Sequence, residues 1–393
     1  MQKCFFLKFN CLFFDKMYIF NFLNIKKIVL YLGAEKPEKQ TSNNPNMKPS
    51  FSFLPFSLLL FSLWKLSVVE VSAQSNFPRY CIVFYNVENL FDPAKDPEKN
   101  DDAFTSSGFY HWTYKRFYKK LNDIAKVFLA INGWEPPDII GLAEIENANV
   151  LKKLCYNTGL KAYQYCYVHY DSPDSRGIDV AMLYRRDRIA IMESHPIAVV
   201  FPFEPNTKNR DILYTKALIA EDTLHLFVNH WTSRFGGHGA TIPKRNYYAQ
   251  VLRSKIDSLL NINAQANIII MGDFNDYPTD ESMMIYLQAK NHKTDEGTLF
   301  NLMLPFVGKN TGTYKSQEFW GCLDQFIVSG SLLNSQNKWQ IENREAIIFD
   351  ASFLLILDEK YGGVKTFRTY LGPKYLGGYS DHLPIKVLLR KEY

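Results

Sequence analysis

The chain has 393 residues, of which 47% are apolar, 15% aromatic and 22% charged, and its formal net charge is +5. This composition is typical of a globular protein and excludes a disordered, collagen-like or disulfide-dense small protein. The length would suit two or three domains of about 150 residues, although α/β enzymes often form larger single domains.

Residues 47–73 have the pattern of a secretory signal peptide. A lysine at position 48 precedes an uncharged apolar stretch, and small residues at 71 and 73 suit cleavage before Gln74. The sequence therefore predicts an exported protein, periplasmic or secreted, whose mature chain has no stable membrane span.

An uncleaved membrane anchor over 49–71 is the alternative for this segment. Its uncharged part, 49–64, has 16 residues, fewer than the ~20 that a spanning helix needs. Residues 1–46 are expected to be an upstream over-translation or a disordered extension, with Met47 as the true start.

The positive charge lies almost wholly in this N-terminal part. Residues 1–73 hold nine of the 45 basic residues and four of the 40 acidic ones, which leaves 36 of each in 74–393. A neutral chain lacks the broad basic surface of a tight nucleic-acid-binding protein. Lys115, Arg116, Lys119 and Lys120 form a local basic run, of a kind that is usually a solvated helix face.

Four cysteines remain in 74–393. Cys81 and Cys322 lie in apolar runs and are expected to be buried. Cys155 and Cys166 are a candidate disulfide pair, which export would permit. No cysteine and histidine spacing indicates a zinc site.

Short apolar runs alternate with amphipathic segments along the rest of the chain. Apolar residues at helical spacing predict helices over 114–131 and 244–260, and Thr279 is expected to cap a third helix. The short runs have the length of buried strands and cover 81–85, 139–142, 180–184, 224–228, 268–271, 326–328 and 385–389. These elements predict one α/β domain over 74–393.

Polar residues stand at the ends of six of these strands. Four strands are followed by them (Asn86; Glu144; Asn229 and His230; Asp273 and Asn275), and two are preceded by them (Asp324; Asp381 and His382). If all of them meet at one rim, the first four strands run toward it and the last two away, which requires a mixed sheet. A single residue of this kind usually serves a turn or a helix cap, but no structural requirement selects the whole set.

Seven motifs in this order resemble the endonuclease/exonuclease/phosphatase superfamily, whose members are deoxyribonuclease-I-like. They are Tyr85-Asn86-Val87-Glu88-Asn89, Leu142-Ala143-Glu144-Ile145-Glu146-Asn147, Arg176-Gly177-Ile178-Asp179, Asn229-His230-Trp231, Gly272-Asp273-Phe274-Asn275-Asp276, Leu323-Asp324-Gln325 and Ser380-Asp381-His382-Leu383-Pro384. The resemblance spans about residues 80 to 390 and is nearest to exported bacterial members. It implies an α/β fold, a four-layer sandwich of two packed mixed β-sheets flanked by helices, with the site at one edge.

The resemblance implies a metal-dependent phosphoester hydrolase, in the first place a nuclease-like phosphodiesterase. A phosphomonoesterase and a phospholipid or sugar-phosphate phosphodiesterase are the alternatives, and a non-catalytic binding module on the same fold is the alternative of a different class. The expected partner is a phosphoester substrate, with nucleic acid among the candidates. The protein is expected to be a monomer without an obligatory protein partner.

By the same resemblance, Glu144 is the principal ligand of Mg²⁺, with Mn²⁺ or Ca²⁺ as alternatives, and Asn86 and Asp381 complete the metal shell. His382, oriented by Asp324, is the candidate general base, and Asp273 is the alternative base. These roles leave open which of the two accepts the proton.

The remaining roles concern the phosphate. His230 is expected to contact the phosphate or protonate the leaving group, and Asn275 with Asp273 to position the attacking water. Arg176, Arg234 and Asn229 are the candidate substrate-binding residues. Asp179 is expected to hold His230 or Arg176, and Tyr379 and Trp320 are expected to pack rather than to stack on a substrate.

Overall fold

The computed structural model describes residues 78–293 and 297–392. The chain from Ser75 onward forms one compact unit. The predicted segments 1–46 and 47–73, with the alternative anchor over 49–71, lie outside the described residues. Within the described ranges, no helix is both long and apolar enough to cross a membrane.

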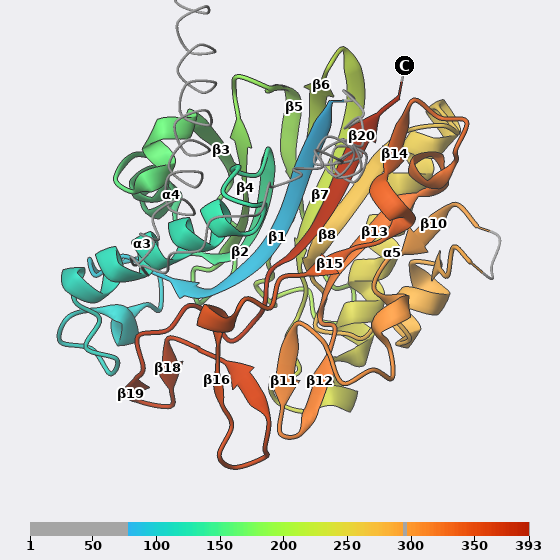
Figure 1. Ribbon diagram of the computed structural model, residues 1–393. Helices are drawn as coiled ribbons and strands as arrows, with labels where there is room; N and C mark the ends of the chain where they lie inside the picture. The colour runs from blue at the N-terminus through green and yellow to red at the C-terminus, as the bar shows by residue number, and fades with distance from the viewer. Residues whose placement is uncertain (1–77, 294–296, 393) are drawn as a thin grey trace, which may run out of the picture. The chain divides into compact units, whose positions relative to one another are not determined.

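Two seven-stranded sheets form the centre of this unit (Figure 1). The first has the order β14-β20-β1-β2-β4-β3, and β15 also pairs with β20. Only the β1–β2 pair in it is parallel. Its strands are β1 (Arg79–Leu90), β2 (Ile139–Ile145), β3 (Tyr165–His169), β4 (Asp179–Arg185), β14 (Trp339–Ile341), β15 (Ile347–Ile348) and β20 (Ile385–Lys391).

The second sheet has the order β5-β6-β7-β8-β13-β10-β9. Here β7–β8 and β9–β10 are the parallel pairs, so both sheets are mixed. Its strands are β5 (Ile189–Ile197), β6 (Ile212–Ile219), β7 (Asp222–His230), β8 (Ile268–Asp273), β9 (Ala289–Lys290), β10 (Leu299–Asn301) and β13 (Asp324–Ser329).

Alternating side chains on the central strands create three apolar layers. Ile82 and Phe84 of β1 pack with Ile269 and Met271 of β8 between the two sheets, whereas Val83 of β1 faces outward. This is the period of two that a strand buried on both faces requires. The sheets therefore lie face to face, each with a second apolar face to be covered.

Three helices cover the outer faces (Figure 1). The helices α3 (Tyr114–Ala130) and α4 (Ala148–Tyr156) pack on the first sheet, and α5 (His238–Ile262) packs on the second. The order helix, sheet, sheet, helix confirms the predicted four-layer deoxyribonuclease-I-like sandwich.

Short elements complete the described chain. Three hairpins lie outside the two sheets: β11 (Tyr314–Ser316) with β12 (Phe319–Gly321), β16 (Leu355–Leu357) with β17 (Val364–Thr366), and β18 (Tyr370–Leu371) with β19 (Lys374–Tyr375). The single-turn helices are η2 (Asp102–Phe104), η3 (Gly159–Tyr163), η4 (Ser282–Tyr286), η5 (Leu304–Phe306), η6 (Gly330–Leu333), η7 (Glu342–Arg344) and η8 (Ser352–Leu354).

One helix begins where the sequence predicts it, and another lacks its predicted N-terminal cap. Thr113 caps α3 by accepting a hydrogen bond from the Arg116 amide. The predicted cap at Thr279 is wrong, because the short π-helical turn η4 begins after Glu281 without a side-chain cap. The Asp280 carboxylate accepts from the amide of Tyr277 instead, so residues 277–280 form a turn before the helix.

The predicted Cys155–Cys166 pair is not joined. Both thiols are free, Cys155 buried in α4 and Cys166 half-buried in β3. Cys81 and Cys322 are buried, as predicted.

Candidate active site

Three strands of the second sheet end or begin in a row of ionisable side chains. In the strand register His230 of β7 stands opposite Asp273 of β8, and Asp273 stands opposite Asp324 of β13. Parallel β7 and β8 run toward this rim and antiparallel β13 runs away from it, which confirms the strand directions predicted from the sequence. All three side chains are buried.

The first sheet brings Asn86 and Glu144 to the same rim. Parallel β1 and β2 end there, and a bulge between Ala143 and Ile145 interrupts β2 at Glu144, whose φ is 65°. A bulge of this kind re-aims one side chain out of the strand's alternation. The Asn89 amide donates to Glu144 Oε2 at 2.7 Å and holds the carboxylate in place.

Asp273 is the centre of the cluster. Its Oδ2 accepts from Asn86 Nδ2 at 3.0 Å, and the Nε2 atoms of His230 and His382 lie 3.6 and 3.8 Å away. Its Oδ1 accepts from the Asn275 amide at 3.0 Å, which fixes the carboxylate plane. Burial raises the pKa of Asp273 to about 7, although the imidazole of His382 opposes the rise.

His382 and Asp324 form a buried carboxylate–imidazole pair. His382 Nδ1 lies 2.7 Å from Asp324 Oδ2, so Nε2 is the ring atom that faces Asp273. Burial alone would lower the pKa of His382, but the carboxylates of Asp324 and Asp273 more than offset it and raise the pKa well above its ordinary value. Ser380 Oγ accepts from the His382 amide and donates to the Asn86 carbonyl, and so ties β20 to the end of β1.

His230 has the opposite electrostatic environment. Burial lowers its pKa well below the ordinary value, and the positive charges of Arg210 and Arg176 lower it further. Its Nδ1 is buried without a hydrogen-bond partner among the described residues. The site therefore contains one neutral and one positively charged imidazole, both with Nε2 close to Asp273.

The donor set at Glu144 and Asn86 fits a hard divalent cation. The side-chain nitrogen of Asn86 lies between two carboxylates, 3.4 Å from Glu144 Oε1 and 3.0 Å from Asp273 Oδ2, and its Oδ1 accepts from the Glu88 amide at 3.0 Å. Two carboxylates that converge on one point favour a positive charge there, and carboxylate and amide oxygens are the ligands that Mg²⁺ prefers. Asp381, the third predicted ligand, is partly exposed and pairs with Arg368 Nη2 at 2.8 Å.

Of the three predicted substrate-binding residues, the structure leaves Arg176 exposed beside the site. Its Nη2 donates to Asn89 Oδ1 at 2.7 Å. The Asn229 amide is buried and donates to the Met271 carbonyl while accepting from Trp231 Nε1.

Arg234 serves the loop rather than the rim. It donates to the Asn275 carbonyl at 2.6 Å, pairs with Asp280 at 3.0 Å and stacks on the Tyr277 ring. The Asn275 side chain likewise turns away and donates to the Trp231 carbonyl, so Asn275 reaches Asp273 through its backbone.

Asp179 holds neither His230 nor Arg176, contrary to the sequence expectation. It accepts from Ser172 and lies 3.1 Å from His169 Nε2, because β4 begins at Asp179 beside β3. Tyr379 is buried against Phe353 at 5.3 Å between ring centroids, in agreement with a packing role.

Arg210 and Arg368 were not anticipated from the sequence. Arg210 is buried and donates to the backbone carbonyls of His230 and Trp231. Arg368 pairs with Asp381 and, at 3.4 Å, with the buried Glu88. Neither lies in a motif, and Arg210 precedes β6, a strand that sequence periodicity did not reveal.

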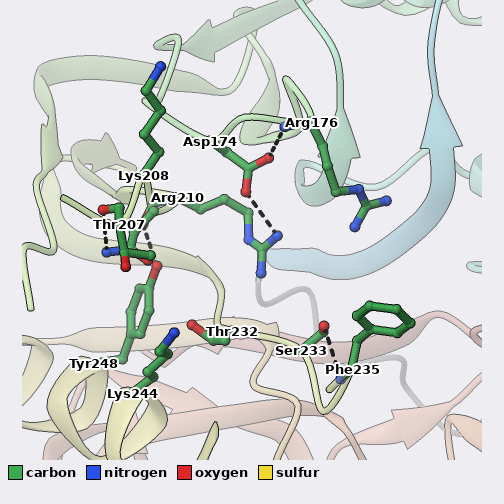
Figure 2. A pocket seen from close by; sticks show the side chains of 11 residues that line it. Asp174, Arg176, Thr207, Lys208, Arg210, Thr232, Ser233, Phe235, Lys244 and Tyr248 are labelled. Atoms are coloured by element: carbon green, nitrogen blue, oxygen red, sulfur yellow. Dashed lines mark hydrogen bonds and ion pairs between the residues drawn. The ribbon is translucent and has the colours of Figure 1, made fainter. Parts of the chain in front are cut away.

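Cavities lie on both sides of the His230–Asp273–Asp324 row. One of about 400 Å³ is lined by Thr232 and Ser233, which directly follow β7, together with Arg176 and Arg210 (Figure 2). Another of about 390 Å³ lies at the β11–β12 hairpin, and aromatic side chains contribute much of its wall (Tyr277, Phe306, Phe319 and Trp320). The first cavity thus adjoins the β7 end of the row, and the second adjoins the β13 end, where Cys322 lines it two residues before Asp324.

Comparison with known proteins agrees with this geometry. Residues 81–391 match the endonuclease/exonuclease/phosphatase family. No curated protein sequence matches the chain.

Solved structures show the same fold. An endonuclease/exonuclease/phosphatase family protein from Bacteroides thetaiotaomicron has a TM-score of 0.51 and 17% sequence identity, over 80% of this chain and 99% of that one. A mannosyl-6-phosphatase from the same organism has a TM-score of 0.50 and 18% identity, over 79% of this chain and 99% of that one. At these identities the likeness establishes the architecture of two mixed sheets flanked by helices.

Proposed function

Because the chain belongs to the endonuclease/exonuclease/phosphatase family and is a phosphoester hydrolase of that family, we propose that it is a Mg²⁺-dependent phosphodiesterase of the nuclease type. The observation that supports a diester is the pair of cavities that flank the His230–Asp273–Asp324 row. A diester carries an organic group on each side of the scissile phosphorus, so it needs space on both sides. The aromatic wall of the second cavity suits a planar base.

Glu144 and Asn86 are the residues that would hold the cation. A bound Mg²⁺ supplies positive charge to the phosphoryl oxygens. Glu144 is partly exposed at the mouth of the site, whereas Asp273 and Asp324 are buried. A phosphate that reaches Glu144 would therefore lie over the buried row.

Asp273 is the better placed proton acceptor. Its Oδ2 lies between the two imidazoles and the Asn86 amide. An attacking water at this point would contact both the Asp273 carboxylate and the residues that would hold the metal. His382 is held as an imidazolium by Asp324, so its Nε2–H is a donor for a phosphoryl oxygen rather than a base. His230 is neutral, and its Nε2 lies 3.6 Å from the same carboxylate oxygen.

Hydrolysis of model esters tests this proposal. Wild type should cleave bis-p-nitrophenyl phosphate and a short single-stranded oligonucleotide with Mg²⁺, and a chelator should abolish both activities. Asp273→Asn should lose about 10²–10⁴-fold in kcat, the usual effect of removing a general base. Asp187→Asn is the matched control, because Asp187 pairs with Arg185 at the end of β4 opposite to the rim.

A phosphomonoesterase is the second candidate, favoured by the neutral charge of residues 74–393 and by the name of one structural neighbour. p-Nitrophenyl phosphate, assayed beside the diester, distinguishes the two. A higher kcat/KM for the monoester would overturn the diesterase proposal.

Export with cleavage before Gln74 stays a prediction, which N-terminal sequencing of the mature protein would test.

A further inference from the structure

The cavity beside His230 has the chemistry of an anion site. Its charged lining consists of four cationic side chains, Arg176, Lys208, Arg210 and Lys244, against the single carboxylate of Asp174. Residues 74–393 as a whole have equal numbers of basic and acidic residues, so this concentration of positive charge is local. Asp174 is already occupied, because it accepts from the Arg176 amide and pairs with Arg210 Nη1 at 3.3 Å.

Figure 2 shows how the cationic side chains lie in this cavity. The Arg210 guanidinium lies near its middle and the Lys244 amine next to the Thr232 hydroxyl, whereas the Arg176 guanidinium turns away from both and donates to Asn89. Lys208 turns its amine away toward the surface. Arg210 uses three of its five N–H groups on His230, Trp231 and Asp174, which leaves two free to donate.

The cavity adjoins the catalytic row directly. Arg210 Nε and Nη2 hold the carbonyls of His230 and Trp231 at 2.9 and 2.7 Å, so the wall of the cavity is the backbone that positions His230. Arg176 contributes to the same wall and also contacts Asn89, the residue whose amide holds Glu144. A molecule whose phosphate reacts at Asp273 can therefore place a neighbouring group in the cavity.

Size and donor type identify that group. The two remaining N–H groups of Arg210, the Lys244 ammonium and the Thr232 hydroxyl suit a phosphate, which offers several oxygens to charge-assisted hydrogen bonds. A volume of about 400 Å³ exceeds that of a phosphate alone, and the ring of Phe235, which is 93% exposed at the rim, can cover the attached carbon skeleton. Resting on the phosphodiesterase function above, we propose that this cavity binds a second, non-reacting phosphate of the same substrate molecule.

Matched substrates test the proposal. Thymidine dinucleotide carrying a 5′-phosphate, a 3′-phosphate or neither, together with bis-p-nitrophenyl phosphate, would be compared by kcat/KM. One of the phosphorylated dinucleotides should exceed the unphosphorylated one by about tenfold or more, since a charge-assisted contact has at least this effect. The gain should appear in KM rather than in kcat, because the second phosphate does not react.

Variants test whether the advantage of the second phosphate depends on residues of the cavity. Lys244→Ala, and the nearly isosteric Thr232→Val, should each reduce the advantage of the second phosphate. Lys255→Ala, an exposed lysine on the same helix α5, should keep it. Glu204→Gln should also keep it, because this change removes the ion pair of Lys244 at 2.7 Å but leaves the ammonium, and the amide oxygen can still accept from Thr207 Oγ1.

A binding measurement is independent of turnover. Inorganic phosphate, titrated calorimetrically, should bind wild type more tightly than Lys244→Ala. A hexose bisphosphate and the matching monophosphate, compared as inhibitors, distinguish a small-molecule substrate from a nucleotide. If the bisphosphate inhibits more strongly but the second phosphate gives no gain in the dinucleotides, the substrate is a small molecule and the phosphate site in the cavity is still supported.

Failure of the cavity assignment can be distinguished from failure of the proposed function. If bis-p-nitrophenyl phosphate is cleaved but no second phosphate improves any substrate or inhibitor, the cavity assignment is wrong and the phosphodiesterase function stands. If no diester is cleaved at all, the proposed function itself fails.

Discussion

At the scale of single residues, the two imidazoles of the site differ in charge because their neighbours differ. His382 faces the carboxylates of Asp324 and Asp273, whereas His230 is buried near the guanidinium groups of Arg210 and Arg176. Similar side chains, both close to Asp273, therefore become a cation and a neutral donor. Charge states of this kind divide acid and base roles within one cluster.

Asp324→Asn should lower the pKa of His382 and so reduce the fraction of imidazolium at a given pH. The carboxylate raises the pKa of His382, so its loss lowers that pKa, and the protonated form then persists only at lower pH. We expect kcat to fall about 10²–10³-fold, the usual effect of losing one donor to developing negative charge, and the alkaline limb of the pH–rate profile to move to lower pH. Proton NMR of the imidazole would follow the titration directly, and an unchanged profile would contradict the role given to Asp324.

Glu146 makes stability depend on pH. Its carboxylate is buried, accepts from the Asp92 amide at 2.6 Å and leaves Oε1 without a hydrogen bond. Burial raises its pKa from 4.5 to about 8. Because the folded pKa is the higher one, the contribution of Glu146 to stability is complete below pH 4.5 and is lost as the pH rises through about 8.

Glu146→Gln should remove this loss, since the amide oxygen can still accept from Asp92 and carries no charge. The variant should exceed wild type by about 5 kcal/mol in free energy of unfolding at pH 9 and differ little at pH 4.5. Urea denaturation at both values, with a chelator present, measures the difference. Equal stability at pH 9 would show that the carboxylate is not protonated in the fold.

At the scale of elements, the contact between β7 and β8 holds the row of ionisable residues together. Gly272 precedes Asp273 and lies against Asn229 so closely that a Cβ added to it would be 2.6 Å from Asn229 Cβ and nearer still to the carbonyl oxygen. A glycine is needed here because two backbones approach each other, not because of its dihedral angles.

Gly272→Ala should push β7 away from β8 and separate His230 from Asp273. We expect a loss of about 1–3 kcal/mol in stability, as for overpacked cores, and a larger loss of activity than that destabilisation explains. Gly239→Ala in α5 is the control, because a Cβ there meets no atom within 4 Å and alanine favours a helix. Activity retained in Gly272→Ala would mean that the row tolerates separation of the strands.

The strands that carry the site were predictable because each is a nearly unbroken apolar run that ends in polar residues. Their directions followed from the requirement that these residues meet at one rim. The strands β5 and β6 were not predicted, because residues such as Glu193, His195 and Lys216 interrupt their apolar pattern. With β6 unrecognised, nothing in the sequence placed Arg210 under His230, and the cavity it lines could not be inferred.

Side-chain partners were harder to predict than strand ends. Sequence spacing placed Asn229, Arg234 and Asn275 near the rim, but it could not show that backbone carbonyls and Asp280 occupy their polar groups. The bulge at Glu144 has no local sequence signal either, since it depends on how β1 and β4 pair with β2.

At the scale of the whole molecule, even the basic run on α3 is largely paired or buried. Lys120 is buried and donates to the Glu88 carbonyl, Lys119 pairs with Asp123, and Arg116 donates to backbone carbonyls and stacks over Tyr375. Lys115 alone of the four is exposed without such a contact among the described residues. The run therefore serves packing and offers little to a phosphate backbone.

This charge distribution predicts a weak dependence of oligonucleotide cleavage on salt. Counterion release scales with the number of phosphates that a protein neutralises, with a log–log slope of about −0.7 for each contact on a single strand. If only the cavity beside His230 and the reacting centre take phosphates, the slope of log(kcat/KM) against log[salt] should be about −1 to −2. It should stay the same when the oligonucleotide is lengthened beyond a few nucleotides, and Lys244→Ala should make it shallower. A slope that steepens with oligonucleotide length would contradict this prediction, because it would require a long row of basic residues that extends far from the site. Residues 74–393 have equal numbers of acidic and basic residues.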